Sequence, residues 1–232
     1  MTEIKICGLT GMKDADYVME AGADYAGMVL YFPISKRNMD IEDAKKVLLY
    51  IECRKKTPVA AVTVSPTAEQ TRAIVSAGFS FIQIHGTLQG ETVEEIEERY
   101  ASGGSFRGMI RAYNGSSVDL EEVKKLAEKP YLYGFLFDAS TPGSGKLLDT
   151  EKLPDRKLLN GKKFFLAGGL DPSNVTDIIR QIRPDVVDVS SGVELKETSA
   201  SELSDKKVSS VVGGGKDRSR IMEFVKSVEI AG

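Results

Sequence analysis

The chain has 232 residues, of which 41% are hydrophobic and 28% are charged, and its formal net charge is −3. These values are typical of a globular protein and exclude a disordered or fibrous chain. Because the balance is slightly acidic and no block of lysine and arginine alternates with aromatic residues, we expect no nucleic-acid partner.

The amino-terminal segment and the cysteines indicate a cytoplasmic protein. Charges at Glu3, Lys5 and Lys13 interrupt any apolar signal segment. No stretch approaches the roughly 20 apolar residues that cross a bilayer, so we expect no membrane partner. Cys7 and Cys53 have neither the spacing of metal ligands nor a disulfide pattern, which favours a reducing cytoplasm.

Strand-like runs rich in β-branched and aromatic residues alternate with helix-like segments along the chain. In the first half, these runs predict strands at residues 3–7, 25–31, 59–64 and 79–84. Apolar residues at helical spacing predict helices at residues 15–21, 41–51 and 67–77. The last of these helices is expected to begin around Thr67, with Glu69 in its first turn.

The same alternation continues in the second half of the chain. Strands are predicted at residues 106–112, 131–138, 164–167 and 186–189. Helices are predicted at residues 91–100, 120–128, 172–182 and 220–228. The alternation of predicted strands and helices therefore continues almost to the carboxyl terminus.

Eight strands connected through crossovers predict a single (β/α)8 TIM barrel of parallel strands covering residues 1–232. No further strand is present to build an open, doubly wound sheet, and the length is close to the ~250 residues of such barrels. Residues 195–216 are rich in Ser, Lys, Glu and Gly and are expected to form a mobile loop insertion after the eighth strand.

Active sites of such barrels lie at the C-terminal ends of the strands. Two glycine-containing turns follow strands seven and eight, the pair of loops that commonly holds a phosphate. Exposed backbone N–H groups in such turns bind anions without any lysine or arginine. The relevant residues are Gly168, Gly169, Ser191 and Gly192. Either turn alone could be a simple connection, but the two together favour an anion site.

Two titratable residues at strand ends are candidates for acid–base chemistry. Cys7 has the same strand parity as Lys5 and is expected to point into the barrel mouth, where nearby positive charge or N–H groups would lower the pKa of its thiol. Asp138 follows an apolar run that would favour the protonated carboxyl group. The alternatives are a small core residue for Cys7 and a turn or helix cap for Asp138.

Two further residues are candidates for substrate binding. Arg37, in the loop after the second strand, could hold a carboxylate in a bidentate pair, or it could be a solvated loop arginine. His85 is the only histidine and ends the fourth strand, where it could titrate, donate a hydrogen bond, or be a satisfied strand-end residue.

A series of motifs follows these candidate residues along the chain. The motifs are Lys5-Ile-Cys-Gly-Leu9, Gln83-Ile-His-Gly86, Asp138 with Gly143-Ser-Gly-Lys146, Leu166-Ala-Gly-Gly-Leu170 and Asp188-Val-Ser-Ser-Gly-Val-Glu194. In order and spacing, the series resembles that of the phosphoribosylanthranilate isomerase family. The resemblance spans residues 3–230.

The resemblance implies an Amadori rearrangement in tryptophan biosynthesis. N-(5-phosphoribosyl)anthranilate would be converted into 1-(2-carboxyphenylamino)-1-deoxyribulose 5-phosphate, without a metal or an organic cofactor. The chain would then be an aldose–ketose isomerase, an intramolecular oxidoreductase. By this resemblance Asp138 would protonate the ribose ring oxygen as general acid, and Cys7 would remove the C2′ proton as general base.

The resemblance also implies how the phosphorylated substrate is bound. Arg37 would hold the anthranilate carboxylate, and Asp188 and His85 would be further substrate-binding residues. The phosphate would be held by backbone amides around Gly168, Gly169, Ser191 and Gly192.

The chain departs from the family pattern at three places. Gly11 stands where an arginine is usual, residues 87–90 lack the usual acidic residue, and residues 195–212 look like an insertion. None of these changes removes a candidate catalytic group. They leave room for a changed substrate preference.

Three other functions stay open at this point. A ribulose-phosphate epimerase would need a metal held by histidines, and the chain has one histidine. An indole-glycerol-phosphate synthase would need catalytic lysine and glutamate residues on strands. A phosphosugar-binding protein without turnover would need neither Cys7 nor Asp138. No sequence feature marks an interface, so we expect a monomer.

Overall fold

The computed structural model describes residues 1–114, 118–138, 153–195 and 215–232. The strands are β1 (Glu3–Ile6), β2 (Tyr25–Leu30), β3 (Asn38–Met39), β4 (Val59–Val64), β5 (Phe81–His85), β6 (Gly108–Asn114), β7 (Leu132–Asp138), β8 (Lys163–Ala167) and β9 (Val186–Val189). The helices are α1 (Met12–Ala21), α2 (Ile41–Glu52), α3 (Ala68–Ser76), α4 (Gly90–Ala101), α5 (Leu120–Ala127), α6 (Val175–Ile182) and α8 (Arg218–Ala231), with the 3₁₀ helices η2 (Arg156–Leu159) and η3 (Ser191–Val193).

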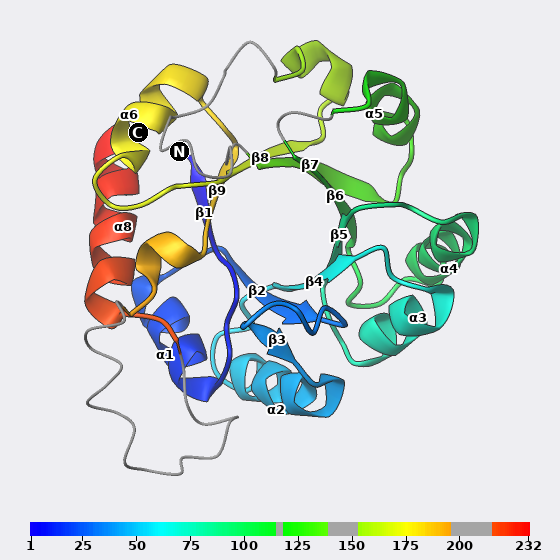
Figure 1. Ribbon diagram of the computed structural model, residues 1–232, viewed down its shortest axis with the longest axis horizontal. Helices are drawn as coiled ribbons and strands as arrows, with labels where there is room; N and C mark the ends of the chain where they lie inside the picture. The colour runs from blue at the N-terminus through cyan, green and yellow to red at the C-terminus, as the bar shows by residue number, and fades with distance from the viewer. Residues whose placement is uncertain (115–117, 139–152, 196–214) are drawn as a thin grey trace.

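The strands form one closed parallel barrel, as the sequence predicts. Their order is β1-β9-β8-β7-β6-β5-β4-β2-β3, and β1 also pairs with β2, so the strands form a closed ring in which the first strand, β1, meets the last, β9. The helices surround this wall on its outside (Figure 1). Strand β3, within a segment expected to be a loop, is a two-residue addition that pairs with β2. In the described part of the β7–β8 connection, the crossover carries η2 in place of an α-helix.

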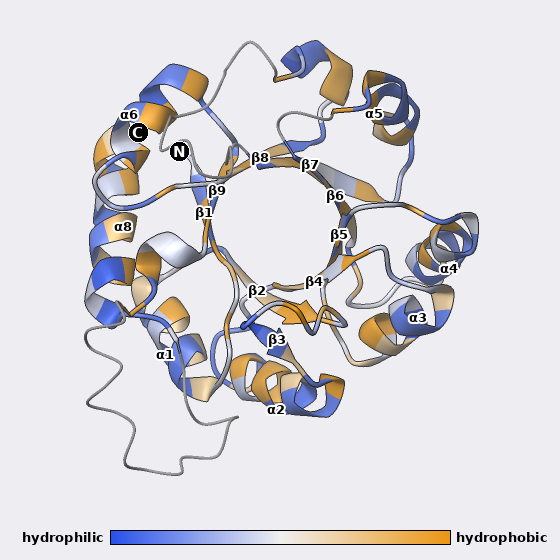
Figure 2. Ribbon diagram, in the orientation of Figure 1, coloured by the Kyte–Doolittle hydropathy of each residue, from blue (hydrophilic) through white to orange (hydrophobic). Residues whose placement is uncertain are grey.

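Local signals explain where several helices begin. The Asp40 carboxylate accepts the N–H of Glu42 and starts α2. Thr67 starts α3 and Glu69 lies in its first turn, as predicted, while Gln70 forms the capping box with Thr67. Hydrophobic and hydrophilic residues alternate along the surrounding helices (Figure 2), and the buried residues of α2 are Ala44, Val47, Leu48 and Ile51. This amphipathic pattern packs one face of each helix on the barrel.

Aromatic side chains fill the barrel near the N-terminal ends of its strands. The ring centroid of Tyr25 lies 5.9 Å from that of Phe81 and 5.7 Å from that of Phe165. The Tyr25 hydroxyl also donates to Glu3 Oε2 at 2.9 Å and lies 2.7 Å from the Tyr133 hydroxyl. This end of the interior is packed, so the polar interior groups lie above it, toward the C-terminal mouth.

The predicted loop insertion at residues 195–216 lies mostly outside the described residues, at 196–214. Its two ends are described and meet. Leu195 donates its N–H to the Gly215 carbonyl at 3.1 Å, and Glu194 forms an antiparallel bridge with Lys216. The described residues on either side of the segment, Leu195 and Gly215, therefore lie together beside η3. Among the described residues, no helix has the length and apolar character needed to cross a membrane.

Candidate active site

Alternation along β1 places Cys7 inside the barrel mouth, as predicted. Ile4 and Ile6 pack in the core cluster shared with the helices, whereas Cys7 packs with Val29 and Val62 in a separate cluster. The Cys7 N–H donates to the Val189 carbonyl at 2.8 Å, which fixes the residue just beyond the end of β1. The thiol is buried and is not part of a disulfide.

Two adjoining cavities open at the mouth. The larger has a volume of about 580 Å³ and the smaller about 310 Å³. Both are lined by Val29, Arg37, Val62, His85 and Asp138. The shared residues make the two cavities one continuous site, large enough for a phosphorylated sugar that carries an aromatic ring.

Asp138 is on β7, three strands around the wall from β1, and it lines the same smaller cavity as Cys7. Asp138 is the last residue of β7, in register with Asn114 of β6 and Ala167 of β8. The sequence predicted that a thiol from the first strand and a carboxyl from the sixth would face a common cavity. The structure has this arrangement.

Beneath Cys7, a buried ion pair spans the closure of the barrel. Lys5 Nζ donates to Asp188 Oδ2 at 2.8 Å, and both side chains are buried. Burial raises the pKa of the Cys7 thiol, and the positive charges of Lys5 and Lys216 only partly offset it. The expectation of a lowered thiol pKa is therefore wrong for the unliganded protein, because desolvation outweighs the nearby cations.

His85 is held in its neutral form. Its Nε2 lies 2.9 Å from Nε2 of Gln83, on the same interior face of β5. Burial lowers the pKa of His85 to about 4, with Asp138 acting in the opposite direction and Lys5 and Arg111 adding to the decrease. At neutral pH the imidazole can therefore exchange hydrogen bonds in the site without adding charge.

The pKa of His85 leads to a prediction about stability. Because the folded-state pKa is about 4 and the ordinary value is 6.5, only the unfolded chain takes up this proton as the pH falls below 6.5. The contribution to the free energy of unfolding is complete above pH 6.5 and is lost between pH 6.5 and 4. It amounts to about 3 kcal/mol at most.

Proton NMR can follow this titration, because His85 is the only histidine in the chain. We expect a midpoint near 4, and urea unfolding should show a smaller loss of stability between pH 7 and pH 4.5 in the His85→Gln variant than in the wild type. A midpoint near 6.5 would show instead that the imidazole is solvated.

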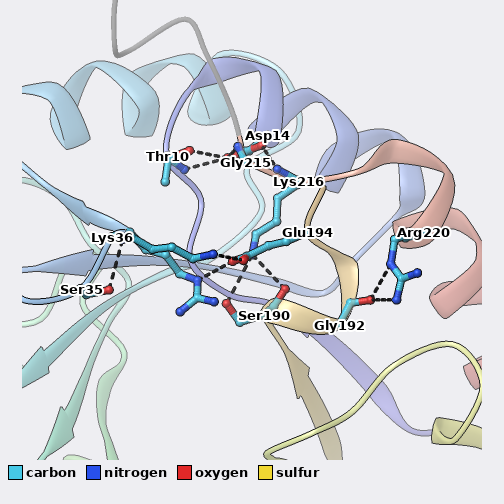
Figure 3. A network of polar contacts seen from close by, with 11 residues as sticks. Thr10, Asp14, Ser35, Lys36, Ser190, Gly192, Glu194, Gly215, Lys216 and Arg220 are labelled. Atoms are coloured by element: carbon cyan, nitrogen blue, oxygen red, sulfur yellow. Dashed lines mark hydrogen bonds and ion pairs between the residues drawn. The ribbon is translucent and has the colours of Figure 1, made fainter. Parts of the chain in front are cut away.

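The expected phosphate turns lie side by side at the mouth. Gly168 and Gly169 have φ values of 97° and 64°, a conformation that favours glycine, and both line the smaller cavity. Helix η3 begins at Ser191, so its first N–H groups lack intrahelical acceptors. Arg220 of α8 donates from Nε (2.9 Å) and Nη2 (2.7 Å) to the Gly192 carbonyl, which fixes this turn (Figure 3).

Gly192 packs against the other expected phosphate turn, at Leu170, where no side chain fits. A Cβ at this position would overlap the Leu170 carbonyl oxygen. Gly192→Ala should displace η3 and raise KM for the phosphorylated substrate at least ~10-fold, with a smaller change in kcat, because the lost contact is one of binding. Steady-state kinetics measure both values. The matched control is Gly90→Ala, where a Cβ meets no atom within 4 Å, and an equal effect there would contradict the assignment.

Arg37 lines both cavities, but part of its guanidinium is already engaged. Its Nε donates to Glu194, which also pairs with Lys36 at 3.0 Å and with Lys216 at 3.3 Å. Figure 3 shows Glu194 lying between Lys36 and Lys216, close to Ser190. Although burial acts in the opposite direction, Arg37 and Lys216 hold the pKa of Glu194 at about 2, with a further contribution from Lys36. Glu194 is therefore an anion that orients Arg37.

Lys216 connects the end of the 196–214 segment to this network. Its Nζ donates to the Ser190 carbonyl at 3.1 Å. The Asp14 carboxylate accepts the N–H groups of Gly215 at 3.2 Å and Lys216 at 2.9 Å, together with the N–H of Thr10 at 2.8 Å (Figure 3). A single buried carboxylate thus ties the loop after β1 to the segment that carries Lys216.

The structure brings the predicted site residues together. All of them except Gly192 line one or both cavities: Cys7, Arg37, His85, Asp138, Gly168, Gly169, Asp188 and Ser191. Sequence reasoning missed Gln83, Glu194 and Lys216. The alternation in β5 could have identified Gln83, because it shares the face of His85. Within the described residues, no group of three or more His, Cys, Asp or Glu side chains could hold a metal ion.

Comparison with known proteins decides the family. The family model for N-(5′-phosphoribosyl)anthranilate (PRA) isomerase matches residues 4–211. The N-(5′-phosphoribosyl)anthranilate isomerase of Streptococcus gordonii is 34% identical over 230 residues, which cover 99% of this chain and 98% of that protein. The chain belongs to the PRA isomerase family.

Solved PRA isomerases have the same barrel. The crystal structure of the enzyme from Thermotoga maritima is 30% identical, with a TM-score of 0.74 and 99% of each chain covered. A PRA isomerase in complex with reduced 1-(o-carboxyphenylamino)-1-deoxyribulose 5-phosphate is 26% identical, with a TM-score of 0.71 and 99% of each chain covered. The PRA isomerase reaction is an Amadori rearrangement in tryptophan biosynthesis, so this chain is an aldose–ketose isomerase.

Proposed function

We propose that the chain isomerises N-(5-phosphoribosyl)anthranilate with Asp138 as general acid and Cys7 as general base. The observation that carries the assignment is that both residues line one cavity of about 310 Å³, whose rim also contains Gly168, Gly169 and Ser191. One substrate held by its phosphate at this rim would then present its sugar carbons to both groups.

The reaction divides into two proton transfers. Asp138 gives its proton to the ribose ring oxygen as the C1′–O bond breaks, and the nitrogen lone pair forms an iminium. The Cys7 thiolate then removes the proton from C2′. The C–H electrons form the C1′–C2′ double bond, and the iminium electrons return to nitrogen, which gives an enolamine that tautomerises to the ketose product.

The remaining residues of the site bind the two ends of the substrate. The N–H groups at Gly168, Gly169 and Ser191 supply donors for the phosphate without a full positive charge. Arg37, oriented by Glu194, lies in the larger cavity, where the apolar side chains of Val29, Val62 and Phe32 can contact the aromatic ring. His85 and Asp188 line the cavity between these two ends and would contact the sugar.

The proposal is tested by adding phosphoribosylanthranilate to the purified protein and following its consumption by fluorescence. We expect complete conversion to the ketose, with turnover unaffected by a metal chelator. Tight binding of the substrate without conversion would instead make the chain a phosphosugar-binding protein.

Two further features are part of this proposal. The chain forms one domain in the cytoplasm, where a reducing environment keeps Cys7 a free thiol. The chain is a monomer, although a Thermotoga maritima relative is described as dimeric. Light scattering of the purified protein at several concentrations measures this directly, and a mass twice that of the 25.3 kDa chain would contradict it.

A further inference from the structure

Lys5 is a fully buried cation on the floor of the site, with 0% of its surface exposed. A charged lysine inside a protein is costly unless it is paired and hydrogen-bonded. Its ammonium donates to Asp188 Oδ2 at 2.8 Å across the β1–β9 pairing. Burial lowers the pKa of Lys5, but Asp188 and Cys7 outweigh this effect and hold the pKa above its ordinary value. Lys5 therefore stays charged.

The ammonium of Lys5 lies beside the thiol of Cys7. The two residues are two positions apart on β1 and its continuation, so both side chains point into the barrel. Gly27 of β2 faces both of them. A Cβ added at Gly27 would lie 2.9 Å from Cys7 Sγ and 3.2 Å from Lys5 Nζ. The missing side chain at Gly27 thus leaves the space in which thiol and ammonium meet.

The charges around Cys7 determine whether its buried thiol can ionise. Burial raises the pKa of Cys7, and the negative charge of Asp188 raises it further. Lys5 lowers the pKa more than any other group does, and its effect is larger than that of Asp188. In the part of the chain that the structure describes, the charged or titratable groups that act on the thiol or line its cavity are Lys5, Asp188, Lys216, Arg37, His85 and Asp138. A cation beside a thiol favours the thiolate, which is the form that can accept a proton.

We propose that Lys5 is a positioning residue for the isomerisation: it holds a positive charge against Cys7 so that the buried thiol can lose its proton to solvent before it takes the proton from the substrate. Asp188 fixes Lys5 in this place with one carboxylate oxygen. Lys5 acts through Cys7 and not through contact with the substrate. The inference rests on the proposed role of Cys7 as general base.

Alkylation of Cys7 tests this inference without any substrate. The experiment uses a Cys53→Ser background, because Cys53 is exposed and would react as well. Iodoacetamide reacts with the thiolate, so its rate against pH reports the ionisation of Cys7. We expect Lys5→Met to move this profile to higher pH by about one to two units, which is a ~10- to 100-fold slower reaction at pH 8.

Steady-state kinetics provide the second measurement. In Lys5→Met, kcat at neutral pH should fall by the same factor, KM should change little, and activity should recover as the pH rises. A merely structural role would lower activity equally at every pH. The matched control is Lys163→Met. Lys163 Nζ also pairs with a carboxylate, Glu3 Oε2 at 2.8 Å, but this pair lies at the N-terminal end of the barrel. The profiles of this variant should equal those of the wild type.

Two results would overturn the inference: an unchanged alkylation profile, or a loss of kcat that does not depend on pH. If Lys5→Met does not fold, the Lys5→Met/Asp188→Asn variant removes both charges of the pair and leaves no unpaired buried ion. A smaller upward shift is expected in this variant, because Asp188 raises the pKa of the thiol and its loss offsets part of the loss of Lys5, whose effect is the larger of the two. A shifted alkylation profile together with a near-normal rate in Cys7→Ser would keep the electrostatic role of Lys5 and reject the base role of Cys7.

Discussion

Cys7→Ser should lower kcat at least ~100-fold, the usual scale of a general acid or base. Serine has nearly the same shape, so it should keep the contacts of Cys7 with Val29 and Val62. Its hydroxyl, however, is a far weaker acid than a thiol and supplies almost no anion at neutral pH. Turnover of phosphoribosylanthranilate, followed by fluorescence, measures the loss.

Cys53→Ser is the matched control for this substitution. Cys53 is exposed and lies at the end of α2, outside the cavities, so its replacement should leave kcat and KM unchanged. A near-normal rate in Cys7→Ser would remove Cys7 from the mechanism. In that case Asp188, which lines the same cavity, would be the next candidate for the base.

Asp138→Asn should lower kcat by a similar factor, at least ~100-fold, because an amide cannot donate a proton to the ring oxygen as it leaves. The side chain keeps its size, so the affinity for the phosphorylated product should stay within a few-fold of the wild-type value. Rapid-mixing experiments would show slow ring opening, the step in which the acid acts. Asp177→Asn, on the exposed face of α6, is the control and should behave as the wild type.

The outcome for Asp138→Asn separates two roles. Loss of turnover with retained product binding supports a general acid. Loss of both turnover and binding, together with a lower melting temperature, would indicate that Asp138 mainly holds the end of β7 in place.

The fold could be predicted because its signals are local. Alternation in the strands put Lys5 and Cys7 inside the barrel, and the strand-end rule selected Asp138 and the turn at Gly168. Both signals depend on neighbours in sequence and on one property of the architecture, that all strands run in the same direction. The pairing of the first strand, β1, with the last, β9, then follows from seven crossovers of one handedness.

The contacts that tune the site could not be predicted from the sequence. Lys5 and Asp188 are 183 positions apart and meet only because the barrel closes between β1 and β9. Arg37 was expected either to hold a carboxylate or to be a solvated loop arginine, and nothing local shows that Glu194 orients it. Lys216 reaches Ser190 after a segment without a periodic pattern.

The ionisation of Cys7 shows the same limit. Nearby positive charge was expected to lower the pKa of the thiol, and the expected cations are present. Whether the pKa of the thiol is raised or lowered nevertheless depends on how completely the thiol is removed from water, and this is set by the packing of side chains at the barrel mouth. Proximity of charge can be inferred from strand parity, but desolvation requires the three-dimensional structure.

A crystal structure of the chain with reduced 1-(o-carboxyphenylamino)-1-deoxyribulose 5-phosphate tests the account most directly. We predict the phosphate at the N–H groups of Gly169 and Ser191, with Cys7 Sγ and the Asp138 carboxyl both in contact with the ribulose carbons and their oxygens. A ligand with its phosphate elsewhere, or with either group directed away from the sugar, would contradict the account.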